Sequence, residues 1–440
     1  MRLYPSIGIQ IPDILLPISG IDYQKWAVIA CDQFTSQPEY WNQVNEIVGE
    51  APSTLRLILP EIFLGRQDEE SRIQSTNHAM KHYCQEELFT IHEGMIAVER
   101  TIGSIKRKGV MIGLDLEKYD YNRGSQTLIR ATEGTIVDRL PPRINIRKNA
   151  TIELPHILVL IDDPEKTVIE PVFESVSESN PLYDFDLMLG SGHLRGWSVT
   201  NKQVEHNLVS ALEKLADPVG FGKKYHVGPE KGVLLYAMGD GNHSLAAAKS
   251  VWEMNKLKFG LNHPSRYALI ELENLHDPAL VFEPIHRVIN GADPDAVLSG
   301  LKSFYGARVK IENVDSMDDM INSVMRHGDF SQRVGLLSAD SFMVAEIMQP
   351  ESNLPVGTLQ SFLDVWLKSV PSVKIDYVHG DDVLASLSAK PGFIGFYLPS
   401  MQKDELFRTV ILDGALPRKT FSMGEAHEKR FYLEARKIIE

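Results

Sequence analysis

The feature that most constrains the fold of this chain is a six-residue polar stretch, Gly239-Asp240-Gly241-Asn242-His243-Ser244. The preceding residues 233–238 form a continuous apolar run that predicts a buried strand. The following residues 245–254 predict a helix. The chain must therefore pass from a strand into a helix through a short turn that carries an acid, an amide, an imidazole and a hydroxyl.

This turn has the residue types of a phosphate site. Gly239 and Gly241 allow the backbone to approach a ligand closely, and the free N–H groups of a helix start favour an anion, above all phosphate. Asp240 could hold a metal ion or accept a proton, and His243 could donate to a phosphoryl oxygen or shuttle a proton. The structural alternative is that Asp240 or Asn242 only caps the helix.

Composition narrows the class of protein. The 440 residues suffice for two or three domains. The formal net charge of −14 argues against binding to nucleic acid or to an anionic membrane. The two cysteines, Cys31 and Cys84, are too few for a disulfide framework or a zinc site and suit a reducing cytoplasm. The N-terminus predicts no signal peptide, and since no run of about 20 apolar residues exists, we expect no membrane span.

Strands alternate with helices without the regularity of a Rossmann or barrel repeat, which predicts an α+β (mixed α/β) protein. Two alternating runs within 94–116 predict a hairpin whose turn is Lys106-Arg107-Lys108-Gly109. A charged final helix is expected from about residue 425. We expect a main domain over 1–290, a small α/β insertion over 291–350, and a segment, 351–440, that returns to the main domain.

A second polar cluster precedes the turn by about a hundred residues, Arg130-Ala131-Thr132-Glu133-Gly134-Thr135 followed by Asp138-Arg139. Arginine forks bind phosphate or carboxylate through two hydrogen bonds. A carboxylate such as Glu133 could position Mg²⁺ beside phosphate or act as a base. A surface ion-pair network is the alternative interpretation.

Two later clusters carry further cations. His286 and Arg287 follow Pro284, which fixes their approach, and Arg418 and Lys419 stand beside hydroxyl side chains that would suit phosphate. A structural role for His286 and a solvated basic turn at 418–419 stay open as alternatives. The chain contains no P-loop, dinucleotide, esterase or zincin motif.

Taken together, these segments resemble the domain-of-unknown-function 1015 family, and they occur in that family's order. They are Trp26–Pro38, Arg130–Leu140, Asp240–Ser244, Pro284–Arg287, Tyr377-Val378-His379 and Pro417–Ser422. The turn usually reads Asp-Gly-His-His-Arg in the family, whereas Asn242 and Ser244 replace the first His and the Arg here. The chain therefore resembles a divergent branch.

The turn is also similar to the nucleotide-phosphate loop of the ParB/sulfiredoxin-like fold. That superfamily includes nucleotide hydrolases and switches, sulfiredoxins, and kinases acting on free serine. The resemblance implies a ParB/sulfiredoxin-like core with extra strands and helices, and a nucleotide phosphate with Mg²⁺ near Asp240–Ser244.

Our hypothesis at this point is a cytoplasmic, Mg²⁺-dependent phosphotransferase that uses ATP or ADP to phosphorylate a small hydroxylated metabolite such as free serine. We expect the dispersed motifs to meet in one cleft, with Asp240, His243 and Glu133 as catalytic groups and Asp240 as the metal ligand. The expected phosphate-binding residues are Gly239, Gly241, Asn242, Ser244, Arg130, His286, Arg287, Arg418 and Lys419. A nucleotide-binding switch or scaffold with little turnover and a phosphoester hydrolase remain alternatives. The oligomeric state, a homo-oligomer included, stays open.

Overall fold

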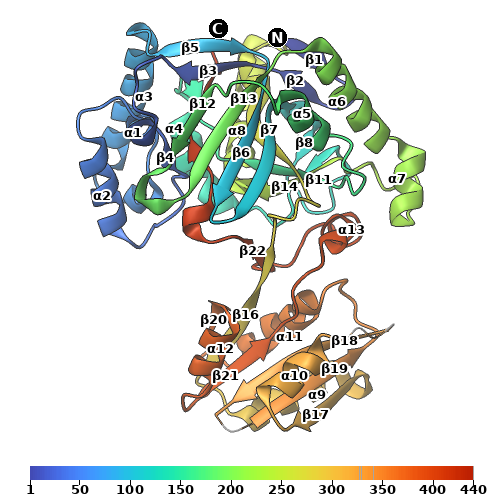
Figure 1. Cartoon of the computed structure of the whole chain (residues 1–440). Helices are drawn as coiled ribbons and strands as arrows, with labels where there is room; N and C mark the ends of the chain where they lie inside the picture. Colours follow the sequence, from blue (N-terminus) through green and yellow to red (C-terminus); the bar gives the residue numbers. More distant parts are fainter. Residues whose placement is uncertain (327, 329, 340, 440) are drawn as a thin grey trace. The chain divides into compact units, whose positions relative to one another are not determined.

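The computed structural model describes residues 1–326, 328, 330–339 and 341–439, and the chain divides into two compact units (Figure 1). Unit 1 comprises Met1–Leu280 and Gly424–Glu440, and unit 2 comprises Val281–Met423. The sequence placed its boundaries at 290 and 350 instead, and those domain limits stay a prediction. Each unit combines sheets with helices, so the expected mixed α/β class is confirmed.

Unit 1 is built on a mixed sheet that, in the described part of the chain, has 11 strands. Along the order given below, adjacent strands from β12 to β15 pair antiparallel. β11 pairs parallel to β15 and antiparallel to β14. β9 pairs parallel to β14 and to β8. In spatial order the strands are β12 (Tyr183–Asp186), β13 (His193–Val199), β6 (Met95–Ile102), β7 (Ile105–Asp115), β15 (Tyr267–Asn274), β11 (Leu158–Ile161), β14 (Tyr236–Asp240), β9 (Ile129–Arg130) and β8 (Tyr119–Asp120), with β2 (Ile9–Ile11) on β7 and β1 (Arg2–Tyr4) on β2.

Alternation along the strands divides the core of unit 1 between the two faces of this sheet. Ala97 of β6 joins one hydrophobic cluster, whereas its neighbours Ile96 and Val98 join the other. This is the two-residue period of a strand buried on both sides. The helices of unit 1 are α1 (Tyr23–Trp26), α2 (Pro38–Val48), α3 (Glu69–Gln85), α4 (Leu140–Arg147), α5 (Glu170–Val176), α6 (Lys202–Leu215), α7 (Pro218–Tyr225) and α8 (Asn242–Phe259).

The predicted hairpin over 94–116 is confirmed as β6 and β7, but its predicted turn is wrong. Ile102 pairs with Ile105, so the turn is Gly103-Ser104, and the cationic run 106–108 lies inside β7. The cations lie in the strand because acids on neighbouring strands pair with them: Lys106 lies 3.1 Å from Glu99. Gly103 has a φ of +58°, which a glycine tolerates in a tight turn.

The expected helix from residue 425 is also wrong. The C-terminal segment Gly424–Glu440 is hereafter called the tail. Its described residues, 424–439, form a short 3-10 turn at Ala426–Glu428 and then two short strands, β23 (Phe431–Tyr432) and β24 (Arg436–Lys437). β23 pairs with β4 (Val28–Ile29) and β24 with β10 (Ile152–Glu153). Burial of Phe431, Tyr432 and Leu433 in succession favours extended pairing over a helix with one apolar face.

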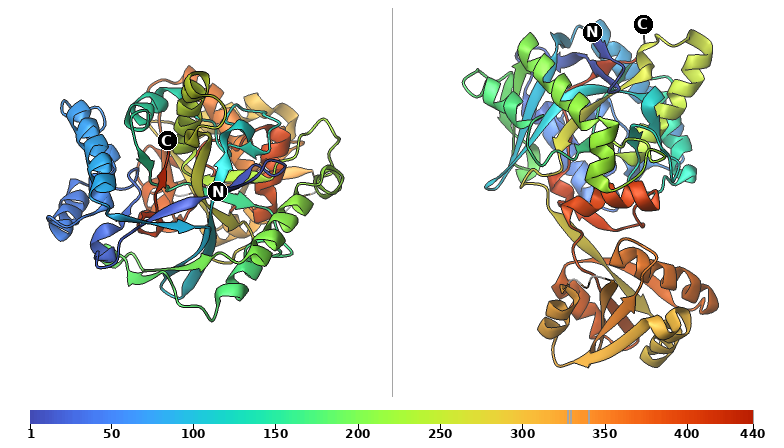
Figure 2. Two further views of the ribbon diagram at one scale, coloured as in Figure 1. Left: turned by 90° about the horizontal axis from the view of Figure 1, so that it is seen from above. Right: turned by 90° about the vertical axis from the view of Figure 1, so that its right-hand side faces the viewer.

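The tail brings the end of the chain back to its beginning within unit 1. Ala435 bridges to Leu15 of β3 (Asp13–Pro17), which pairs with β5 (Phe89–Glu93). The indole of Trp26 donates to the Leu433 carbonyl at 3.1 Å. Figure 2 shows the two ends of the chain near each other at one end of unit 1.

Unit 2 contains an antiparallel sheet that, among the described residues, has seven strands. Helices α9 (Pro294–Tyr305), α10 (Met317–Val324), α11 (Pro355–Ser369), α12 (Asp381–Ser388) and α13 (Lys403–Asp413) accompany it. In spatial order the strands are β17 (Val309–Val314), β19 (Ser341–Met348), β18 (Ser331–Ser338), β21 (Phe393–Tyr397), β16 (Phe282–Asn290) and β20 (Lys374–His379), with β22 (Phe421–Met423) also on β16.

Candidate functional site

The polar turn predicted from the sequence lies between β14 and α8 of unit 1. β14 ends at Asp240, α8 begins at Asn242, and Gly241 between them has a φ of +77°. A Cβ on Gly241 would lie 3.1 Å from the Cα of Ile157. Only glycine combines this left-handed conformation with so close a backbone contact. Glycine at 241 is therefore what allows the chain to turn directly from strand into helix.

A cavity of about 160 Å³ opens at the start of α8. It gathers the predicted residues Glu133 and Asp240–Ser244, except that Gly239 lies within β14 and does not line it. Asp32 and Arg143 also line it, and sequence reasoning did not assign either to the site. Asp32 directly follows the apolar residues 26–31, and this position is a signal that could have found it. Within unit 1, two of the predicted clusters therefore share one cavity.

Asp240 is held as a carboxylate by the tail. Its Oδ2 lies 3.1 Å from the Lys429 ammonium, and its Oδ1 accepts from the Gly241 N–H at 2.8 Å. Burial acts to raise the pKa of Asp240, but the charges of Lys429 and His156 and the Gly241 hydrogen bond outweigh it and lower that pKa. Asp240 is therefore ionised at neutral pH and neutralises a lysine at the site.

The fit of Mg²⁺ to this cavity depends on carboxylates other than Asp240. Both Asp240 oxygens already have protein donors, which compete with a cation. In the part of the chain that the structure describes, no group of three or more His, Cys, Asp or Glu side chains could hold a metal. Mg²⁺ usually takes one or two protein carboxylates and completes its shell with phosphate oxygens and water. Asp32 and Glu133, which line the same cavity, have the chemistry for that role.

His243 is neutral at physiological pH. Its Nε2 accepts from the Ile136 N–H at 3.3 Å, so the neutral ring carries its proton on Nδ1. Burial, followed by the charges of Arg143 and Arg139, lowers the pKa of His243 to about 4. The ring can therefore donate a hydrogen bond to a phosphoryl oxygen from Nδ1, whereas it is poorly suited to carry a proton as an imidazolium near pH 7.

Ser244, in the first turn of α8, begins a chain of side-chain hydrogen bonds. Its Oγ lies 3.0 Å from Nε2 of His156, and Nδ1 of His156 lies 2.6 Å from the Tyr432 hydroxyl. Tyr432 also accepts from the Cys31 N–H at 3.2 Å. His156 and Tyr432 are buried. The three side chains come from α8, from the loop before β11, and from the tail.

A second cavity, of about 120 Å³, adjoins this chain and shares Arg143 and Ser244 with the first. Its walls are mainly apolar, with His156 and Tyr432 among the polar members. Sequence reasoning missed His156, Tyr432 and Lys429. His156 directly precedes the apolar run 157–161, which is a usable signal. The two tail residues were missed because the final segment was incorrectly predicted as a helix.

Arg130 does not line the cavity. It is buried, and its Nε donates to the Thr127 carbonyl at 2.8 Å while Nη2 donates to the Gly232 carbonyl. Burial lowers the pKa of Arg130 to about 10. These contacts join β9 to the loop before β14, so Arg130 supports the local fold of the site.

The remaining four predicted phosphate ligands belong to unit 2, and their convergence with the turn stays a prediction. His286 is buried: its Nε2 lies 3.0 Å from the Asp381 carboxylate, and its Nδ1 accepts from the Leu398 N–H at 3.2 Å. Since that carboxylate needs a donor, Nε2 carries the proton of the neutral ring.

The other three residues of this group are basic and belong to β16 and to the loop before β22. Arg287 is buried, with Nη2 donating to the Arg418 carbonyl at 2.9 Å. The Arg418 guanidinium pairs with Asp364 at 2.6 Å. Lys419 is exposed and has a φ of +55°. Arg287 and Arg418 are thus engaged in the structure of unit 2 itself.

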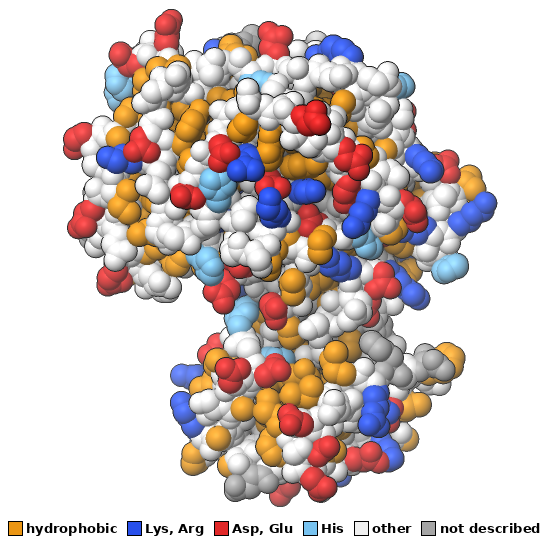
Figure 3. Space-filling view, viewed as in Figure 1, with side chains coloured by type: hydrophobic (Ala, Val, Ile, Leu, Met, Phe, Trp, Pro, Cys, Tyr) orange, Lys and Arg blue, Asp and Glu red, His pale blue; other side chains and the backbone are white. Residues whose placement is uncertain are grey.

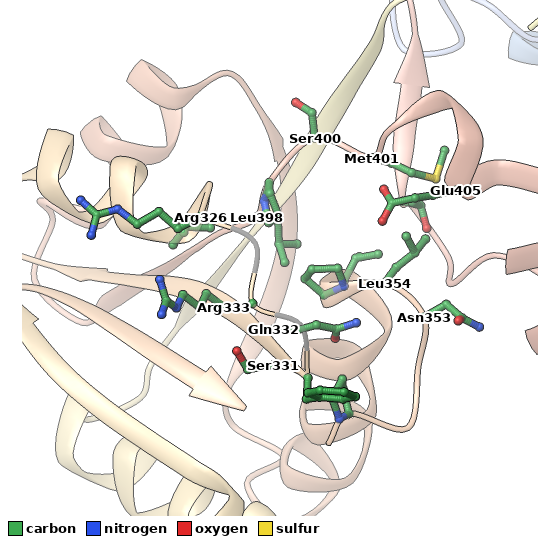
Figure 4. A pocket seen from close by; sticks show the side chains of 18 of the residues that line it. Arg326, Ser331, Gln332, Arg333, Asn353, Leu354, Leu398, Ser400, Met401 and Glu405 are labelled. Atoms are coloured by element: carbon green, nitrogen blue, oxygen red, sulfur yellow. The ribbon is translucent and has the colours of Figure 1, made fainter. Parts of the chain in front are cut away.

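Unit 2 has a larger cavity of about 490 Å³, shown in Figure 4. Several of its polar side chains are paired with neighbours: Arg333 with Glu346 at 3.1 Å, and Gln332 with the Ser352 carbonyl at 2.9 Å. It lacks, among the described residues that line it, the combination of carboxylates, imidazole and helix start found at α8. The cavity at α8 is therefore the stronger candidate for chemistry.

The visible face of the molecule does not present a basic field. Figure 3 shows Lys and Arg side chains interspersed with Asp and Glu side chains over unit 1. No helix in the described ranges is long and apolar enough to cross a bilayer.

Solved structures similar to this chain have low sequence identity to it. A conserved hypothetical protein from Pyrococcus furiosus is 12% identical, with a TM-score of 0.36, and the match covers 75% of this chain and 95% of that one. Mutants of a free serine kinase in complex with AMP and with ADP are 11% identical, with TM-scores of 0.39, covering 74% of this chain and 92% of theirs. SbnI from Staphylococcus aureus is 8% identical, with a TM-score of 0.36, covering 75% of this chain and 87% of its own.

Comparison with curated proteins gives no match. A family model described as a protein of unknown function (DUF1015) matches residues 15–366, about four fifths of the sequence. Because that match spans most of both units, the chain belongs to the DUF1015 family.

Proposed function

We propose that this protein is a phosphotransferase that moves a phosphoryl group from ATP or ADP to a small hydroxylated metabolite, with free serine as the first acceptor to test. The observation that carries the proposal is the single cavity at the start of α8. It combines the helix N–H groups, the neutral His243, the Ser244 hydroxyl and the carboxylates Asp32 and Glu133. Such a set suits an anion whose charge is redistributed during transfer.

The start of α8 supplies the phosphate contacts in this proposal. The N–H groups of the first turn favour an anion. His243 adds a neutral donor at Nδ1, and Arg143 lines the same cavity. Asn242 Oδ1 is buried without a hydrogen-bond partner among the described residues, so a donor from a bound ligand would satisfy it.

Glu133 is the proposed base for the acceptor hydroxyl, and Glu133 with Asp32 is the proposed carboxylate pair for Mg²⁺. When bound, the cation would neutralise charge on the phosphate oxygens. Asp240 then has the role of positioning Lys429 and the turn. This role differs from the metal ligation expected from the sequence, because Asp240 already has a donor on each oxygen.

The size of the cavity limits what it encloses. Pockets that bury a drug-sized ligand measure about 300–1,000 Å³, whereas this cavity measures about 160 Å³. It therefore has room for phosphate groups, while the nucleoside would lie outside it. The residues at α8 accordingly support a phosphate-binding role and give no preference for one nucleobase over another.

Phosphorus NMR tests the proposal directly. The purified full-length protein is incubated with Mg²⁺, ATP or ADP, and a pool of amino acids and sugars that includes serine. We expect a new phosphomonoester signal that is lost in Asp240→Ala and His243→Ala. Transfer at the wild-type rate in both variants would contradict the proposal.

The remaining outcomes separate the alternatives. Free phosphate without a phosphomonoester would favour the phosphoester hydrolase. Unchanged nucleotide that nevertheless binds and alters the oligomeric state would favour the switch or scaffold. The matched control is Ser250→Ala, since Ser250 lies later in α8 and its hydroxyl donates to the Ala246 carbonyl at 3.0 Å.

A further inference from the structure

Ser244, His156 and Tyr432 have the arrangement of an activated nucleophile. The hydroxyl lies 3.0 Å from a ring nitrogen of His156, and the other ring nitrogen lies 2.6 Å from a buried phenol that orients the ring. A nucleophile, a base within hydrogen-bond distance and a third group behind the base form the general pattern of covalent catalysis. The three residues lie far apart in sequence, so the fold itself assembles the pattern.

The hydrogen bonds are consistent with His156 as the acceptor of the serine proton. If Nδ1 carries the ring proton, it donates to the Tyr432 oxygen, which also accepts from the Cys31 N–H at 3.2 Å. Nε2 is left to accept from Ser244.

His156 and Ser244 both line the second cavity of unit 1. Ser244 itself lies where the two cavities of unit 1 meet, so one cavity could hold the phosphate and the other the group that enters or leaves.

We propose that Ser244 accepts the phosphoryl group before the acceptor does, so that transfer passes through a phosphoserine at the start of α8. This inference rests on the proposed phosphotransferase function. It makes Ser244 the nucleophile and His156 its base, and Tyr432 a positioning residue that acts through His156.

The first step forms the bond between Ser244 Oγ and phosphorus. The bond between phosphorus and the leaving oxygen of the nucleotide breaks, and the nucleotide departs with one phosphate fewer. The serine proton passes to His156 Nε2. In the second step the acceptor oxygen attacks phosphorus and the bond to Oγ breaks. Oγ regains its proton from His156, while the acceptor proton passes to Glu133 and then to solvent.

The stereochemical course of transfer decides between this route and direct transfer. Each in-line displacement inverts the configuration at phosphorus, so two displacements retain it and one inverts it. Full-length protein is supplied with Mg²⁺, ATP with a chirally labelled γ-phosphoryl group, and the acceptor found by NMR. We expect retention of configuration. Inversion would overturn the phosphoserine, although it would leave the proposed phosphotransferase function in place.

Intact-mass measurement with Mg²⁺ and ATP but no acceptor provides a second test. We expect a mass increase of one phosphate on Ser244 that survives acid, together with its absence in Ser244→Ala and an unchanged label in Ser250→Ala. His156→Asn should slow labelling by about 10²–10⁴-fold. Tyr432→Phe should slow labelling less and shift the pH profile of labelling, because the His156 imidazole stays in place but loses the hydroxyl that it contacts. An acid-labile label, or acceptor phosphorylation at the wild-type rate in Ser244→Ala, would contradict the inference. Absence of both label and phosphorylated product would contradict the proposed phosphotransferase function as well as the phosphoserine.

Discussion

At the residue scale, Gly241 is the position where the backbone geometry most strictly requires the residue that the sequence supplies. We predict that Gly241→Ala destabilises unit 1 by roughly 1–2 kcal/mol through its left-handed backbone, and by more through the contact of the new Cβ with the Ile157 backbone. Gly124→Ala is the matched control, because Gly124 has a φ of +79° and nothing within 4 Å of its Cβ position. Four of the five tryptophans lie in unit 1, so urea unfolding followed by fluorescence reports on it. Equal losses in the two variants would contradict the predicted contact.

His243 gives a pH-dependent prediction. Its pKa of about 4 in the folded chain lies below the ordinary value of 6.5. As pH falls through 6.5 the unfolded chain gains a proton that the folded chain does not gain until about pH 4. Stability should therefore fall by roughly 1–3 kcal/mol between pH 6.5 and 4 and be unaffected by this group above that range. His243→Gln should remove that part of the pH dependence. An identical slope in both proteins over this window would contradict it.

The residues that sequence reasoning found and missed differ for a physical reason. The turn at 239–244 is a local signal, because its glycines, its acid and the flanking apolar run lie within one continuous segment. His156, Tyr432 and Lys429 matter because of contacts to residues 88, 276 and 189 positions away, respectively. Such pairings depend on how strands order in the sheet, which local patterns do not specify.

At the element scale, the tail is the part of the fold that the sequence predicted worst and the site uses most. Its residues were expected to form a helix, whereas they form two short strands that deliver Lys429 and Tyr432 to the site. The hairpin of β6 and β7 was predicted correctly as an element, while its turn was misplaced by the run of cations. In both cases tertiary contacts prevailed over the local sequence pattern.

The ion pair between Lys429 and Asp240 connects the tail to the end of β14, and its loss should be measurable. We predict that Lys429→Met destabilises unit 1 by roughly 1–3 kcal/mol, because the Asp240 carboxylate, 25% exposed, is left without its cation. Asp240→Asn in the Lys429→Met background should restore part of the loss. Additive effects in this double-mutant cycle, followed by urea unfolding, would show that the pair contributes nothing.

At the scale of the whole molecule, the chain leaves unit 1 once and returns once. The departure and the return are adjacent, since Phe282 at the start of β16 pairs with Met423 at the end of β22. Unit 2 is therefore one continuous segment with its own sheet and a hydrophobic cluster around Met320 and Leu384. Unit 1, in contrast, depends on residues from both ends of the sequence.

This topology predicts different behaviour for three fragments. Residues 281–423 expressed alone should fold cooperatively, whereas residues 1–280 alone should not, because they expose the strand edges and the indole of Trp26 that the tail covers. Paired residues across antiparallel strands have Cβ atoms about 5 Å apart, so a short glycine-serine linker can join residue 280 to residue 424. That linked unit 1 should recover a cooperative transition. Circular dichroism with urea unfolding measures all three, and a cooperative transition in 1–280 alone would contradict the role given to the tail.

The linked unit 1 also decides whether the second unit belongs to the phosphate site. It retains Glu133, Asp240, His243 and Ser244 but lacks unit 2, including His286, Arg287, Arg418 and Lys419. The contacts of Arg287 and Arg418 within unit 2 lead us to expect that linked unit 1 binds ATP with Mg²⁺ within about threefold of the full chain. Calorimetric titration gives the comparison, and Asp240→Ala in the linked protein is the control for specific binding. A much larger loss, with the fold intact by circular dichroism, would place unit 2 in the nucleotide site as the sequence first predicted.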